Sequence, residues 1–141
     1  MLYNDLKTFA MAIFKTRWFD RWARKQGLTV DCLCAAVVEM SAGQYEAALG
    51  GGLLKKRIAR LGQGKRGGFR ALVATNRNDR WIFVFGFSKN VRGNISVVEE
   101  TALKLLAEHL LALTALGLEQ AQSDGELMEL HCDEKGEFTD S

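Results

Sequence analysis

The sequence is poor in the residues that cross-link small proteins, bind their metals or act as their catalytic bases. Its 141 residues include three cysteines, two histidines and no proline. An odd number of cysteines gives no disulfide framework, and Cys32, Cys34 and Cys132 do not have the CxxC spacing of a zinc site. We therefore expect reduced thiols, no bound metal and no cofactor.

Long apolar runs are also missing. A membrane-spanning helix needs about 20 predominantly apolar residues, and the best candidate, residues 102–118, is interrupted by Lys104 and Glu108. This segment is therefore expected to be an amphipathic helix. Residues 1–10 carry charge and lack the apolar core of a signal peptide. We expect a cytoplasmic protein with no membrane partner.

Two common classes of catalytic site have little support in the sequence. The glycines within 50–52 and 62–64 lack the spacing and the following helix of a phosphate-binding loop. A serine or cysteine triad needs a histidine base. His109 falls inside the expected amphipathic helix, where a surface role is typical, and His131, near an expected strand end, is the other histidine.

The net charge of +2 conceals a strong separation of charge along the chain. Residues 47–98 contain eleven basic side chains and one acid, whereas residues 99–141 contain two basic and eleven acidic side chains. A segment this basic predicts binding to a polyanion, and the acidic segment could mask part of it. The basic side chains of the middle segment are Lys55, Lys56, Arg57, Arg60, Lys65, Arg66, Arg70, Arg77, Arg80, Lys89 and Arg92.

Two helices are expected in the first third of the chain. Thr16 is a suitable N-cap for a helix in which Trp18, Phe19 and Trp22 share one face. Their helical spacing favours core packing over base stacking as the role of these aromatic residues. A second helix over residues 30–40 completes a helical hairpin.

Strands are expected after this hairpin. Residues 53–59, 69–75 and 81–87 are predicted as strands, and β-branched and aromatic residues dominate the last of them. A flexible glycine-rich loop and a tight turn at 76–79 join them into an antiparallel meander. Residues 11–14 form a short extended start, and residues 125–131 are a candidate edge strand.

The third strand of the meander is expected at the centre of the sheet. Trp81, Phe83 and Phe85 alternate with Ile82 and Val84, so both faces of the strand are apolar. A strand of this kind needs a covering layer on each side.

A long C-terminal helix is expected from Val97 to a point near Gly117, because Ser96 and Glu99 have the spacing of a capping box. The expected fold is therefore α+β, with an N-terminal helical hairpin, a three- to four-stranded mainly antiparallel sheet and this helix. The residues expected on its buried face are Val98, Ala102, Leu105, Leu106, Leu110 and Leu113.

The candidate functional feature is a cluster of cations on the meander. Lys55 and Arg57 share one face of their strand, whereas Lys56 points to the other. Arg70 on the next strand and Lys89 just after the third can approach the same phosphate, because neighbouring strands lie about 4.8 Å apart.

At these residues the sequence resembles the RelE superfamily of bacterial toxins, in its HigB-like branch. The resemblance rests on FKTRWF at 14–19, LGGGLLKKRIA at 49–59, GKRGGFR at 64–70 and FGFSKN at 85–90. It covers most of the chain. We expect a toxin domain over residues 11–132, preceded by an extension at 1–10 and followed by a polar tail at 133–141.

The resemblance implies a β-sheet packed against helices and a ribosome-dependent endoribonuclease that cuts messenger RNA in the A site. It also implies a cognate antitoxin, expected to carry a helix-turn-helix. Arg57, Arg70 and Lys89 match the basic positions of the family, and His131 could stand in for a late tyrosine or histidine of some relatives. We expect Arg57 and Arg70 to bind the reacting phosphate and Lys89 to transfer a proton or stabilise charge. The expected RNA-binding residues are Lys55, Lys56, Arg60, Lys65, Arg66, Phe87, Asn90 and Arg92.

Two other functions remain open. A toxin of the same superfamily with another target, such as DNA gyrase, would share the fold. A non-catalytic RNA-binding module would use the same cationic sheet.

Overall fold

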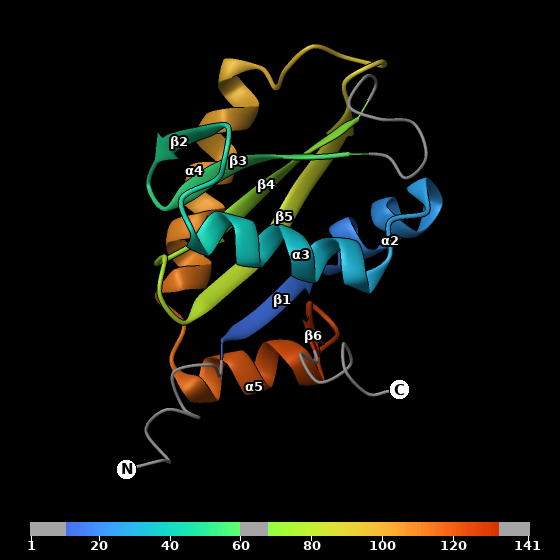
Figure 1. Cartoon of the computed structure of the whole chain (residues 1–141). Helices are drawn as coiled ribbons and strands as arrows, with labels where there is room; N and C mark the ends of the chain where they lie inside the picture. Colours follow the sequence, from blue (N-terminus) through green and yellow to red (C-terminus); the bar gives the residue numbers. More distant parts are fainter. Residues whose placement is uncertain (1–10, 60–67, 133–141) are drawn as a thin grey trace, which may run out of the picture.

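The computed structural model describes residues 11–59 and 68–132. Within them, six strands form one mixed sheet with helices on both faces (Figure 1). The strands are β1 (Ala12–Thr16), β2 (Ala47–Gly50), β3 (Leu53–Ile58), β4 (Phe69–Thr75), β5 (Arg80–Ser88) and β6 (Leu127–Leu130), in the order β2-β3-β4-β5-β1-β6. The helices are α2 (Arg17–Gln26), α3 (Val30–Ser41), α4 (Val97–Leu111) and α5 (Ala115–Ser123).

The α+β class is confirmed, but the expected number of strands is wrong. The extended start of the chain is β1, which runs parallel to β5 and antiparallel to β6 inside the sheet. The helical hairpin of α2 and α3 therefore follows a strand. β2, which pairs with β3 at the edge, was not predicted. Its four residues carry no β-branched side chain, and β1 pairs only with distant segments, so local signals were weak for both.

The predicted helix starts are confirmed by their caps. The Thr16 hydroxyl accepts a hydrogen bond from the Phe19 N–H at 3.1 Å, and Gly27 ends α2 with φ 76°. At α4, the Ser96 hydroxyl accepts from the Glu99 N–H and the Glu99 carboxylate accepts from the Ser96 N–H. These contacts satisfy backbone donors that the first turn leaves unpaired.

The long C-terminal helix differs from the prediction in its length and its buried face. α4 ends at Leu111, and Thr114 caps a second helix, α5. Leu110 is buried as predicted, but Val98 and Leu105 are 78% and 64% exposed, and Ala107, which was not predicted on the buried face, is buried. The inward stripe of α4 is therefore rotated from the predicted one. No single helix among the described residues is long and apolar enough to cross a membrane. α4 and α5 together have the length and composition of a span, but they are bent by 114° relative to each other.

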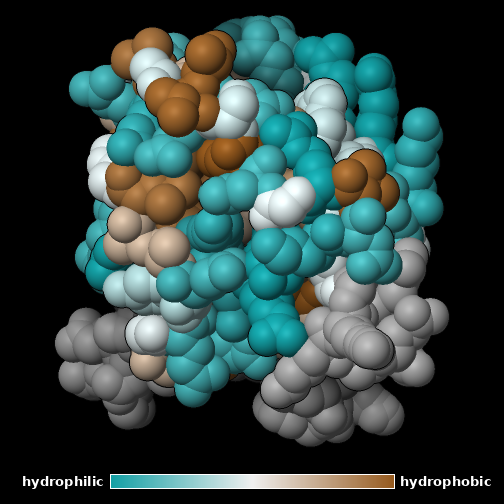
Figure 2. All heavy atoms as spheres, turned by 90° about the horizontal axis from the view of Figure 1, so that it is seen from above, coloured by the Kyte–Doolittle hydropathy of each residue, from teal (hydrophilic) through white to brown (hydrophobic). Residues whose placement is uncertain are grey.

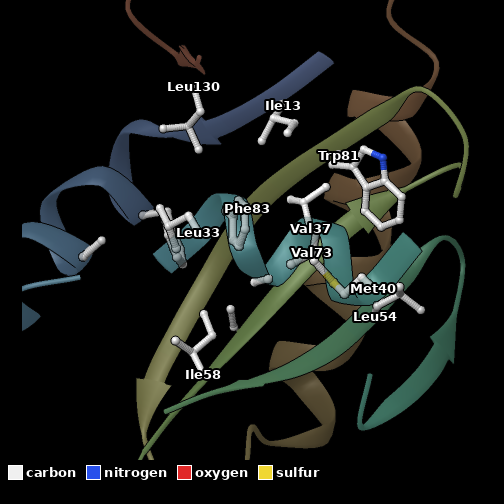
Figure 3. Close-up of a cluster of buried hydrophobic side chains, with 14 of the residues drawn as sticks. Ile13, Leu33, Val37, Met40, Leu54, Ile58, Val73, Trp81, Phe83 and Leu130 are labelled. Carbon is white, nitrogen blue, oxygen red and sulfur yellow. The ribbon is translucent and has the colours of Figure 1, made fainter. Parts of the chain in front are cut away.

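β5 is central and packed on both sides, as predicted. Trp81 and Phe83 lie in a core beneath α2 and α3 (Figure 3), and Ile82 and Val84 lie in a second core with α4. A β-bulge opposite Leu72 and Val73 interrupts the alternation, because Leu72 pairs with Phe85 and Val73 with Phe83. Phe85 therefore joins the second core, against the prediction that it shares a face with Trp81 and Phe83.

The aromatic face of α2 was only partly assigned correctly. Phe19 is fully buried, and Trp22 packs over Gly86, where a Cβ would lie 2.3 Å from the indole ring. Trp18, in contrast, is 45% exposed. The prediction of core packing is therefore right for Phe19 and Trp22. It is wrong for Trp18, because almost half of that side chain is exposed.

The expectation of reduced thiols is also corrected. Cys34 on α3 and Cys132 after β6 form a disulfide, although 98 residues separate them in sequence. They meet because α3 crosses the sheet face above β1, and β6 pairs with β1. Cys32 is a free thiol. Spacing along the chain gives no sign of such a pairing.

Candidate active site

Two arginines and a phenylalanine lie in one row across the three strands of the meander. Arg57 on β3 pairs with Arg70 on β4, and Arg70 pairs with Phe87 on β5. Directly paired residues share a face of the sheet, about 5 Å apart. The predicted convergence of Arg57 and Arg70 is therefore present in the register. Arg57 is exposed, whereas the Arg70 side chain retains 12% of its accessible surface.

Two lysines lie next to this row and bind neutral oxygens. Lys55, two residues before Arg57, donates from Nζ to Oδ1 of Asn94 at 3.3 Å. Lys89, just past the end of β5, donates from Nζ to the carbonyl oxygen of Gly93 at 2.8 Å. Neither lysine has a carboxylate partner among the described residues. Their positive charge is therefore available to an anion at the site.

Arg70 is held by an acid. Its Nε donates to Oε1 of Glu46, just before β2, at 2.6 Å. Among the described residues, Glu46 is the hydrogen-bond partner of the Arg70 guanidinium. Because the bond uses Nε, the two Nη nitrogens can still donate to another acceptor. Glu46 thus fixes the guanidinium and also offsets part of its charge.

The segment between β5 and α4 covers one side of the row. Arg92 lies over the Phe87 ring, with Cζ 5.8 Å from the centroid, and forms an ion pair with Glu99. This hydrogen bond from Arg92, together with those from Ser96, lowers the pKa of Glu99 to about 2. The same carboxylate therefore caps α4 and anchors the segment.

Two of the predicted RNA-binding residues lie outside the row, and a third, Phe87, lies in the row but is buried. Lys56 is buried on the opposite face, where its Nζ bonds Glu39 at 2.6 Å and the Gln44 carbonyl at 3.0 Å. Phe87 is 4% exposed, so its ring is a packing surface for Arg92. Asn90 is exposed in the turn after Lys89. The predicted residues Arg60, Lys65 and Arg66 lie outside the described part of the chain.

The histidines and the acids of α5 and β6 lie elsewhere. His131 follows β6, whose last residue, Leu130, pairs with Ile13 near the start of β1. Ile13 in turn pairs with Trp81 near the start of β5, whereas Phe87 lies near the other end of that strand. His131 therefore cannot stand in at the cationic row, and Glu129 on β6 cannot mask it. Among the described acids of this segment, Glu99 comes nearest to the row through its ion pair with Arg92, which lies over Phe87.

Sequence reasoning missed the contacts that organise the cations. Glu46, Asn94 and Glu99 each bind one of them, from segments that pair with or follow the meander. The capping box did identify Glu99, but as a helix cap alone. No local signal in the sequence connects Glu46 with Arg70, 24 positions later.

Comparison with known families bears on this arrangement. A family model described as the RelE toxin of the RelE/RelB toxin–antitoxin system matches residues 11–130. The chain belongs to the RelE toxin family. No curated protein matches the chain.

Membership of the RelE family assigns the cationic row to a toxin that works with a cognate antitoxin. The matched residues begin at β1 and end at β6, so they include every described strand. The row of Arg57 and Arg70 is thus part of the toxin fold itself.

Proposed function

We propose that this RelE-family toxin is a ribosome-dependent messenger RNA endoribonuclease of the HigB-like branch, acting in the cytoplasm. The observation that supports this most is the pairing of Arg57 with Arg70, beside two lysines whose charge no described acid offsets. Two arginines whose Cβ atoms are paired across neighbouring strands, about 5 Å apart, can direct both guanidinium groups to the non-bridging oxygens of one phosphate.

The chemistry that this site favours is transesterification. The ribose 2′-oxygen attacks the adjacent phosphorus and loses its proton, while the 5′-oxygen of the next nucleotide leaves and gains one. The products are a 2′,3′-cyclic phosphate and a 5′-hydroxyl. Arg57 and Arg70 stabilise the negative charge that builds on the phosphate oxygens, and Lys89 supports the proton transfer or that charge.

A dependence on the ribosome follows from the shortage of acid–base groups. No histidine among the described residues lies at the row. Alignment of the 2′-oxygen with the scissile bond must then supply much of the rate, and a bound ribosome can provide it. Purified toxin should cut messenger RNA on translating ribosomes and leave naked RNA largely intact. Vigorous cutting of naked RNA would refute this dependence.

The role of Arg70 separates a nuclease from a simple RNA binder. In Arg70→Ala we expect cleavage on ribosomes to fall about 10²- to 10³-fold, with a much smaller change in affinity. Arg77→Ala is the matched control, because Arg77 bonds the Tyr45 hydroxyl at 3.0 Å in the turn between β4 and β5. Equal losses of cleavage and affinity in Arg70→Ala would favour the RNA-binding module.

A toxin directed at gyrase would behave differently in cells. Mapping of transcript ends after induction should reveal new ends within coding regions if messenger RNA is the target. Intact transcripts together with DNA breaks would indicate gyrase and contradict the nuclease. The cognate antitoxin is expected to carry a helix-turn-helix and to mask the cations, since an exposed basic surface binds nucleic acid without selectivity. Sequencing the neighbouring reading frame tests that expectation.

A further inference from the structure

Trp18 is an exposed aromatic side chain in an ordered stack. It lies in the first turn of α2 and is 45% exposed. Its ring stacks on Phe85 with centroids 4.6 Å apart and planes at 20°, and it lies nearly parallel to Trp22 at 6.2 Å. The indole is thus held in one orientation by two neighbours while almost half of its surface faces solvent.

This stack lies next to the cationic row. β1 ends at Thr16, whose hydroxyl is 3.5 Å from the Val84 carbonyl oxygen, so α2 starts beside the last part of β5. Phe85 and Phe87 share a face of β5, and two residues of a strand span about 7 Å. Phe87 is in register with Arg70 and Arg57. Trp18 therefore lies beside the row: it stacks on Phe85, which is two residues before Phe87 on the same face of β5.

The outer face of α2 is strongly basic. Arg17, Arg21 and Lys25 follow one another at four-residue spacing, and all three are exposed. None of them forms an ion pair with another described residue. The acid of this helix, Asp20, is buried and binds Lys15 at 2.8 Å and Arg24 at 3.0 Å. The exposed charge of the helix is therefore not offset.

We propose that Trp18 is a base-stacking site for single-stranded RNA, with Arg17 and Arg21 binding the phosphates on either side of the stacked base. An aromatic ring flanked by unpaired cations is the combination that binds single strands, since the ring takes any base and the cations follow the backbone. The site rests on the proposed function for its role, which is to hold a nucleotide near the phosphate at Arg57 and Arg70. Charge at both flanking positions favours RNA over an apolar protein partner.

The test measures binding of a 2′-O-methyl oligoribonucleotide, which has no attacking 2′-hydroxyl and cannot be cut by transesterification. The Trp18→Ala variant should bind about tenfold more weakly than the wild type, and Trp18→Phe should retain most of the affinity. Leu116→Ala is the matched control, because Leu116 is 73% exposed on α5, away from the site. Unchanged affinity in Trp18→Ala would overturn the proposal, as would equal weakening in Trp18→Phe.

Salt dependence tests the phosphate contacts. Replacing both Arg17 and Arg21 with alanine should lower the slope of log affinity against log salt by about 1.4, or about 0.7 for each phosphate. If antitoxin binding weakens in Trp18→Ala while oligonucleotide binding does not, the surface is a protein contact and the proposal is wrong. These measurements need no cleavage, so they remain decisive even if the nuclease function fails its own test.

Discussion

The cations in and beside the row fall into two groups according to the charge of the group that each one binds. Lys55 and Lys89 bind neutral oxygens, whereas Arg70 and Arg92 bind the carboxylates of Glu46 and Glu99. The carboxylates orient their arginines, and the lysines retain uncompensated charge. An incoming phosphate therefore meets fixed guanidinium groups and free ammonium charge at one place.

Glu99 gives a prediction about pH. Its pKa is about 2, below the usual 4.5, because Arg92 and Ser96 hydrogen-bond its ionised form. A carboxyl whose pKa is lowered by folding stabilises the fold above pH 4.5, and this contribution is lost as the pH falls from about 4.5 to 2. Glu99→Gln should therefore be less stable than the wild type at neutral pH, and the difference should vanish toward pH 2.

Urea midpoints measured from pH 7 to 2 check this prediction. Glu119→Gln, which removes a carboxyl on α5, gives the background change. A constant difference between Glu99→Gln and the wild type across this range would contradict the assigned role of Glu99.

At the scale of elements, the end of β5 is shaped by one glycine. Gly86 allows Trp22 to lie directly on the strand, and Trp22 in turn supports Trp18. The bulge just before it turns Phe85 toward the second core. Together these two features form the aromatic side of the site.

Gly86→Ala should destabilise the protein by about 1–3 kcal/mol, because the new Cβ would lie 2.3 Å from the Trp22 ring and force it away. Gly93→Ala is the matched control, since a Cβ there meets nothing within 4 Å. Urea unfolding of both variants provides the measurement. Similar stabilities for the two would show that Trp22 moves without cost.

Elements with strong local signals could be predicted from the sequence. The meander strands and the caps at Thr16 and Ser96 depend on neighbours within a few residues. The alternation in β3 correctly separated Lys56 from Lys55 and Arg57. The bulge, the place of β1 and the rotation of α4 depend on contacts with distant segments, so the sequence pattern could not determine them.

At the scale of the whole molecule, charge is separated in space as well as in sequence. The cationic row lies at the far end of β5, uppermost in Figure 1, and α5 and β6 lie at the opposite end. Seen from that upper end, the surface is mainly hydrophilic, with separate hydrophobic patches (Figure 2). The acids of α5 and β6 therefore cannot neutralise the row within one chain, and in the proposed function the antitoxin neutralises it.

The disulfide is a property of the whole fold, and it gives a prediction about stability. Closing a chain of 98 residues between Cys34 and Cys132 restricts the unfolded state. Cys34→Ser should lower the free energy of unfolding by about 2–4 kcal/mol, and Cys32→Ser should have little effect.

Urea unfolding with and without a reductant checks the disulfide. The reductant should weaken the wild type and Cys32→Ser and leave Cys34→Ser unchanged. Equal stability of the wild type in both conditions would show that the bond does not contribute.

The position of β1 has a consequence for the order of folding during synthesis. Ala12 pairs with Arg80 and Ile13 with Leu130, so the first described strand emerges long before either neighbour exists. The three-stranded meander can assemble from local contacts before β1 is paired. Pairings between segments that are distant in sequence, such as those of β1, form slowly. Completion of the sheet is thereby delayed until β6 has been synthesised.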